Sequence, residues 1–141
     1  MNAERYKQLA REFCQCAGLP SDDPFLRTGM LKIDGLDVLL HYDEEFDPER
    51  LQIRVDFGEL PEATGSRLAL ALSVLSVNFE HGFGGLHVFS VNPNNGHVVF
   101  TKQHVIDTAT TAQDLYGDLA QSISEAHASW EEAINRVTAV S

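Results

Sequence analysis

The segment 67–79, RLALALSVLSVNF, consists almost entirely of apolar and small residues. Its leucine and alanine content, its length and the glycine at position 82 favour a helix over a strand. On a helical repeat the apolar residues fall into two stripes on different sides. The first stripe consists of Leu68, Leu72, Leu75 and Phe79. The second consists of Leu70, Val74 and Val77. A helix that is apolar on two sides needs two covers. The second cover is either another copy of the chain, which would make this helix a dimer interface, or a second layer of the same chain.

The length and the composition indicate one globular domain over residues 1–141. At this length a single core can bury roughly two thirds of the surface that the unfolded chain exposes. No apolar run approaches the roughly 20 residues that cross a bilayer. The amino-terminal residues also lack the apolar segment of a signal peptide. We therefore expect a cytoplasmic protein that does not insert into membranes.

The charge balance argues against a nucleic-acid partner. Ten lysines and arginines stand against 21 aspartates and glutamates, which gives a formal net charge of −11. Each phosphate contact normally needs a cation, and the few cations are scattered along the chain. The acidic segment 43–49 lacks the residue order of a calcium-binding loop. We expect it to be a solvated loop that could attract a cationic partner.

No group of residues in the sequence predicts a reaction or a metal site. Cys14 and Cys16 point to different sides of a predicted helix and lack the further ligands of a zinc site. None of the six histidines is paired at the i, i+4 spacing of a helical metal site, and a Gly-x-Ser-x-Gly motif is absent. The glycines at 82–85 follow a helix and enter a strand, whereas a phosphate loop follows a strand and opens a helix. We expect no catalytic residue, no metal and no cofactor.

The remaining pattern predicts helices and strands in the order α-β-β-β-α-β-β-α. Helices are expected over 4–18 and from Thr110 or Thr111 to Val137, on either side of the central helix. Strands are expected over 30–33, 36–42, 51–57, 86–91 and 97–102. Asp34-Gly35 and the segment 92–96 supply the hairpin turns. Because the crossover rhythm of a parallel sheet is missing, the fold class is α+β, a five-stranded antiparallel twisted sheet covered by three helices.

The first strand, residues 30–33, could lie at an edge of this sheet. An apolar edge strand offers unpaired N–H and C=O groups to an extended peptide, whose alternate side chains then need pockets. The first helix could wall such a groove with Leu9 and Phe13. The alternative is that both residues belong to the ordinary core.

The order of elements and several short sequences resemble the class I chaperones of bacterial type III secretion, the Tir-chaperone family. The resemblance runs from Tyr6 to Val137. It is carried by LKIDG at 31–35, the helix at 68–78 with its glycine-rich turn, LHVF at 86–89 with the Asn95-Gly96 hairpin, and a terminal helix with Trp130 near its end.

The resemblance implies a homodimeric, ATP-independent chaperone that binds the segment behind the secretion signal of an effector and keeps it extended and export-competent. In that family the second helix and the following strand form the dimer, and the first helix and first strands carry apolar patches for the effector. Carried onto this sequence, the expected dimer interface is Leu70, Val74, Val77, Leu86 and Val88. The expected effector-binding residues are Leu9, Phe13, Leu31, Ile33 and Leu39.

Two other functions remain open. One is a small-ligand protein or metal-dependent enzyme on the same α+β scaffold, with His87 and His97 beside the second hairpin. The other is a secretion-system regulator that has the chaperone fold but no effector client.

Overall fold

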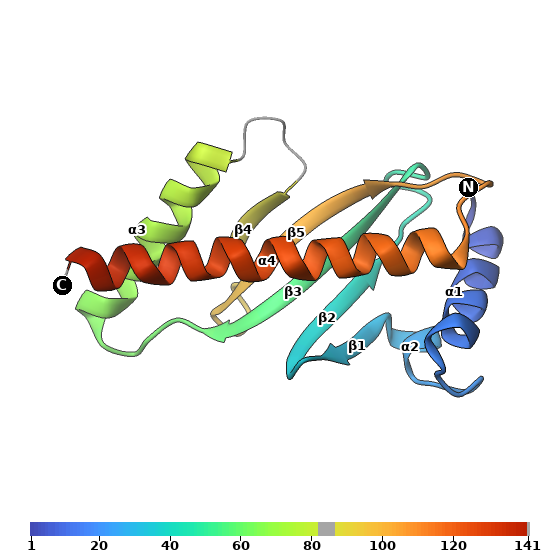
Figure 1. Ribbon diagram of the computed structural model, residues 1–141, viewed down its shortest axis with the longest axis horizontal. Helices are drawn as coiled ribbons and strands as arrows, with labels where there is room; N and C mark the ends of the chain where they lie inside the picture. The colour runs from blue at the N-terminus through green and yellow to red at the C-terminus, as the bar shows by residue number, and fades with distance from the viewer. Residues whose placement is uncertain (82–86, 141) are drawn as a thin grey trace.

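The structure, a computed structural model, describes residues 1–81 and 87–140, with side chains described as far as Val137. The elements are α1 (Ala3–Ala17), α2 (Phe25–Thr28), β1 (Met30–Ile33), β2 (Leu36–His41), β3 (Arg50–Glu59), α3 (Thr64–His81), β4 (His87–Val91), β5 (His97–Val105) and α4 (Ala112–Val140). All paired strands are antiparallel, and they lie in the order β1-β2-β3-β5-β4 (Figure 1). The predicted α+β class and the five-stranded antiparallel sheet are therefore confirmed.

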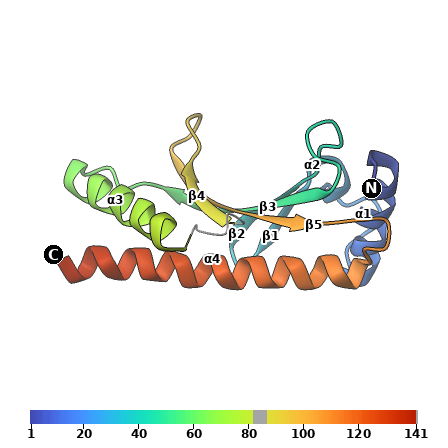
Figure 2. The ribbon, with the colours of Figure 1, turned by 90° about the horizontal axis from the view of Figure 1, so that it is seen from above.

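The longest helix, α4, lies along one face of the sheet and continues past it (Figures 1 and 2). α1 packs near its amino-terminal end, and α3 packs beside its carboxyl-terminal half. The stripe predicted from the sequence is the face that α4 buries, beginning with Leu115, Leu119, Ile123 and Ala126. Although α4 has 29 residues, neither it nor any other helix among the described residues is apolar enough to cross a membrane.

The core lies between α4 and the face of the sheet turned toward it. The central strands alternate between buried and less buried residues, as expected for a sheet with one wet face. The buried residues of these strands include Val38, Leu40, Leu51, Ile53, Val55, Val98 and Phe100. Trp130 of α4 stacks on Phe57 of β3, with ring centroids 4.7 Å apart, and lies 6.2 Å from Phe89 of β4. These rings join α4 to two strands that are not neighbours in the sheet.

The predicted turns and caps have the backbone geometry that their sequences require. Asp34 and Gly35 have φ of 51° and 80°, the positive values of a two-residue hairpin turn. Gly18 ends α1 with φ of 73°. At the start of α4, Thr111 Oγ1 accepts a hydrogen bond from the Asp114 N–H at 3.1 Å, as predicted for an N-cap residue.

A short helix, α2, occupies residues for which the sequence predicted no element. Asp23 caps it by accepting a hydrogen bond from the Phe25 N–H at 2.9 Å. The buried Phe25 ring lies 5.5 Å from that of Phe13, between ring centroids. One turn of helix carries no repeating apolar stripe, so the sequence pattern could not reveal it.

Several elements also differ from the prediction in length. β3 and β5 are longer than predicted because they pair with each other from Arg50 with Val105 to Glu59 with His97, with a shift in register between Asp56 and Glu59. α3 begins at Thr64, before the apolar segment 67–79 from which it was predicted. The predicted helix stop at residue 82 lies outside the described residues.

We predict that Gly29→Ala destabilises the protein more than Gly18→Ala does. Both glycines have φ of 73°, where an L side chain costs roughly 1–2 kcal/mol. A Cβ at Gly29 would also collide with the Leu40 carbonyl oxygen, whereas at Gly18 it would meet nothing within 4 Å. In urea denaturation, Gly18→Ala should lose about 1 kcal/mol of unfolding free energy and Gly29→Ala at least about 2 kcal/mol. Equal losses would show that the turn between α2 and β1 is not pressed against β2.

Candidate functional site

β1 lies at an edge of the sheet, as predicted, and no strand among the described residues pairs with its outer side. The Leu40 N–H donates to the Gly29 carbonyl at 2.9 Å, and the pairing of an antiparallel ladder alternates from there. The main chains of Leu31 and Ile33 therefore face β2, while that of Lys32 points away from the sheet. An N–H and a C=O in this position can pair with an added strand.

An apolar groove runs beside this edge, on the α4 side of the sheet. Leu31 and Ile33 form one wall, and residues of α1 and α4 form the other. The groove is lined by Phe13, Ala17, Leu19, Leu31, Lys32, Ile33, Tyr116, Leu119, Ala120 and Ile123. Leu31 and Ile33 are only half-buried, and Tyr116 is 53% exposed. We call this apolar surface the β1 groove.

The β1 groove brings together three of the five residues predicted to bind an effector. Leu31 and Ile33 line it directly, and Phe13 lines it from α1 although only 2% of that residue is exposed. Leu9 does not belong to the groove, because it is completely buried in the core. Leu39 lies on the opposite face of the sheet, since its neighbours in β2 alternate between the two faces.

α3 is apolar on two sides, as the sequence predicted, and the two stripes lie in different environments. One stripe is buried within the chain, where Ser73 Oγ also donates to the Ala133 carbonyl of α4 at 2.6 Å. Its members Leu70, Val74 and Val77 are 5%, 4% and 2% exposed. The other stripe faces solvent, with Leu68, Leu72, Leu75 and Phe79 being 59%, 55%, 59% and 73% exposed. We call this second set the α3 stripe.

The residues predicted for a dimer interface lie in different environments. Leu70, Val74 and Val77 are covered by the chain itself. Val88 is exposed, and Leu86 lies outside the described residues. Periodicity separates two stripes on a helix but does not reveal which of them the rest of the chain covers.

The opposite edge strand of the sheet, β4, is capped by a side chain. The Asn78 amide nitrogen donates to the Phe89 carbonyl at 2.9 Å, and its amide oxygen accepts from the Phe89 N–H at 2.8 Å. This pair of bonds is the one that a residue of a neighbouring strand would make. Strand addition at Phe89 would therefore have to displace Asn78.

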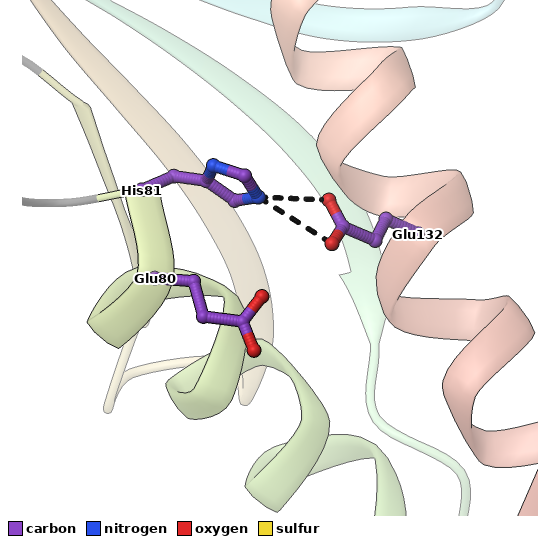
Figure 3. Close-up of side chains that lie close together, drawn as sticks. All are labelled: Glu80, His81 and Glu132. Carbon is purple, nitrogen blue, oxygen red and sulfur yellow. Dashed lines mark hydrogen bonds and ion pairs between the residues drawn. The ribbon is translucent and has the colours of Figure 1, made fainter.

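One group in the described part of the chain has the composition of a metal site. Glu80 and His81 at the end of α3 lie close to Glu132 of α4, with their ligand atoms within 4.8 Å of one another (Figure 3). Arg136 donates to both Glu80 and Glu132, and its hydrogen bond to Glu80 holds the pKa of that carboxyl below its usual value. Because an arginine already pairs with both carboxylates, we interpret the group as an ion-pair clasp between α3 and α4.

A polar layer lies inside the core between β5 and α4. Lys102 donates to Glu125 at 2.6 Å. His104 Nε2 lies 2.5 Å from Ser122 Oγ, and His104 Nδ1 lies 3.7 Å from Asp118 Oδ1. His104 lies between the serine and the aspartate, as the histidine of a hydrolase triad does. Ser122 is 0% exposed, however, so a substrate cannot reach its hydroxyl. The layer instead satisfies polar groups that α4 buries.

The two histidines beside the second hairpin do not form a pair. His97 Nδ1 lies 2.9 Å from a carboxylate oxygen of Asp56 on β3. His87 stacks on Phe100, with ring centroids 5.5 Å apart. The structure therefore gives no geometric support to a metal or small-ligand site made of these two residues.

The sequence matches no family model and no curated protein. Its fold, however, matches solved structures of protein complexes. The ExsC–ExsE complex matches with a TM-score of 0.66 and 23% identity, over 89% of this chain and 92% of the other. The HopA1–SchA chaperone–effector complex matches with a TM-score of 0.58 and 14% identity, over 93% of this chain and 98% of the other.

A third match is the heterodimeric ExoU–SpcU complex from the type III secretion system of Pseudomonas aeruginosa. Its TM-score is 0.53 with 17% identity, over 87% of this chain and 95% of the other. The chain therefore has the fold of the type III secretion chaperones, and the resemblance predicted from the sequence is confirmed at the level of the fold.

The polar layer predicts how stability depends on pH. Burial lowers the pKa of His104 below its ordinary value of 6.5, so on acidification the unfolded chain binds a proton that the folded chain resists. The folded state therefore loses stability relative to the unfolded state as pH falls through the pKa of histidine in the unfolded chain. The stability advantage of the wild type over His104→Gln should therefore shrink between about pH 7.5 and about pH 5.5, as measured by urea denaturation.

Acidification changes the contribution of Asp118 to stability in the opposite direction. Burial raises the pKa of its carboxyl, which favours the folded state as pH falls toward the unfolded value. His104 and Asp118 interact, so the comparison reports the effect of removing the imidazole from this pair. An advantage of the wild type that stays constant or grows on acidification would contradict a neutral, buried His104.

Proposed function

We propose that this chain is a type III secretion chaperone, which binds an extended segment of an effector in the cytoplasm and keeps it competent for export. The shared fold of three secretion complexes supports this class. The observation that carries the proposal is the open edge of β1 beside the β1 groove. There an incoming chain can extend the sheet and place alternate side chains on apolar surface.

The geometry suits holding a segment without folding it. An added strand would pair with the outward N–H and C=O of Lys32, while its side chains on the α4 side would contact Leu31 and Ile33. Each apolar side chain buried in this way contributes roughly 1.5–3 kcal/mol. A few such anchors offset the entropy lost when an extended segment is ordered. All of these contacts with the client are non-covalent.

We further propose that the chain acts as a homodimer through the α3 stripe. Leu68, Leu72 and Leu75 are leucines on one side of a helix, each more than half exposed. A contiguous apolar surface of this kind on a folded protein marks an interaction site. The carboxyl-terminal half of α4 adds an apolar hollow beside it, lined in part by Ala69, Leu72 and Val137. Two copies would place two β1 grooves on one assembly, which strengthens the binding of a long segment.

The β1 groove can be tested with a displayed library of short random peptides, because such a library needs no knowledge of the natural client. The wild type should enrich peptides with alternating apolar residues. Leu31→Asp should abolish this enrichment, since it places a charge in the apolar groove. The melting temperature should change little, because Leu31 is only half-buried.

A matched control is Val105→Asp, which puts the same charge on an exposed residue of β5 that is 69% accessible. This variant should enrich the same peptides as the wild type. Loss of folding in Leu31→Asp would show that Leu31 is core. Unchanged enrichment in a folded Leu31→Asp would remove the β1 groove from the proposed function.

The dimer has a separate test in light scattering or analytical ultracentrifugation. Leu75→Glu should convert the dimer to a folded monomer, since a charge on each copy would be buried at the interface. Val105→Glu should leave the dimer intact, because this residue lies on β5, away from α3. A monomeric wild type, or a Leu75→Glu variant with the mass of a dimer, would contradict the α3 stripe as the interface.

A further inference from the structure

A second groove lies between α1, α2 and β2, outside the β1 groove. Its apolar surface comes from Tyr6, Ala10, Leu26 and Leu39, among others. Leu39, which the sequence predicted to contact an effector, lines this second groove and not the β1 groove. The second groove carries three cationic side chains, which are Lys7, Arg11 and Arg27. The cation that lines the β1 groove, Lys32, is paired with Asp37.

Two of these cations have no carboxylate partner among the residues that the structure describes. Lys7 pairs with Glu4 at 3.4 Å, and most other cations of the described chain are paired as well. Arg11 and Arg27 are exposed, and neither pairs with a carboxylate among the described residues. Lys7 and Arg11 are also four residues apart on α1, a spacing at which like charges repel and destabilise a helix. In a chain with 21 acidic and ten basic residues, this is a local site for a negative charge.

The walls that carry the two arginines are fixed in place. Arg27 lies in the last turn of α2, and the chain then passes through Gly29, where any Cβ would collide with the Leu40 carbonyl of β2. On the opposite wall, the Tyr6 ring stacks on that of Tyr42, with centroids 4.8 Å apart. The groove is therefore built before a ligand arrives, which lowers the entropy lost on binding.

We infer that this second groove binds an aspartate or glutamate of the client segment, flanked by an apolar residue, through Arg11 and Arg27. This inference rests on the proposed function and names the chemistry of the client. An arginine pairs with a carboxylate through two parallel hydrogen bonds, which gives directional recognition. Leu26 and Leu39 would take the neighbouring apolar side chain.

The net charge of the chain makes such a site selective. A chain of net charge −11 repels an acidic segment at most places on its surface. In physiological salt, charges interact only weakly beyond about 8 Å, so a carboxylate is favoured close to unpaired cations such as Arg11 and Arg27. The site therefore fixes the register of the extended client more than it adds affinity.

The test uses peptides enriched by the wild type from the displayed random library. These peptides should contain a conserved acidic position. Replacing that acid by its amide should weaken binding to the wild type about threefold, and should have no effect on binding to Arg11→Gln/Arg27→Gln. Arg67→Gln is the control, because Arg67 is an arginine of α3 outside this groove, and it should behave as the wild type does.

Each other outcome has a defined meaning. Enriched peptides without an acidic position, or an equal effect of the amide on the wild type and the double variant, would overturn the inference and leave the β1 groove standing. If the wild type enriches no peptide, the proposed function and the inference both fall. Binding of phosphatidylglycerol vesicles to the wild type but not to the double variant would assign the arginines to a membrane surface and overturn the inference.

Discussion

α4 is longer than the sheet that it covers, and this difference in length decides where the other helices can pack. Its 29 residues span about 43 Å at the rise of an α helix. The longest strand, β3, has ten residues and spans about 33 Å. The excess carries α4 past the sheet, where α3 packs against it, while α1 occupies the other end (Figure 1). The β1 groove and the α3 stripe are thereby kept at opposite ends of the molecule.

The two edge strands of the sheet, β1 and β4, differ in whether their outward main chain is already hydrogen-bonded. At β4 the side-chain amide of Asn78, a residue of α3, already bonds both the N–H and the carbonyl of Phe89. At β1 the Lys32 main chain points outward beside apolar surface. An exposed edge normally invites uncontrolled association. Here one edge is closed by the chain's own side chain and the other is short, which limits pairing to a segment that also fits the β1 groove.

Much of the fold could be predicted from the sequence because its signals are local. The Asp34-Gly35 turn requires positive φ at two successive residues, and the α4 stripe repeats over many turns. The length of β3 could not be predicted, because it depends on pairing with β5, which is distant in the sequence. α2 is one turn long and shows no periodicity.

The candidate site was predictable only in part, for a related reason. Hydrophobic periodicity identified two faces of α3 but not which of them the core covers. Leu70, Val74 and Val77, predicted for a dimer interface, lie on the face that the chain covers itself. Leu9 and Phe13 are equally apolar, yet only Phe13 reaches the β1 groove. The unpaired Arg11 and Arg27 have no signature at all in the sequence, because pairing is a property of the folded surface.

The central claim, that a client segment extends the sheet at β1 and not at β4, can be measured by amide hydrogen exchange with and without an enriched peptide. The Lys32 N–H should exchange freely in the unbound protein and become protected when the peptide binds, because the added strand accepts its hydrogen bond. The Phe89 N–H, already bonded to Asn78, should show the same protection in both states. New protection at Phe89 with none at Lys32 would contradict the account.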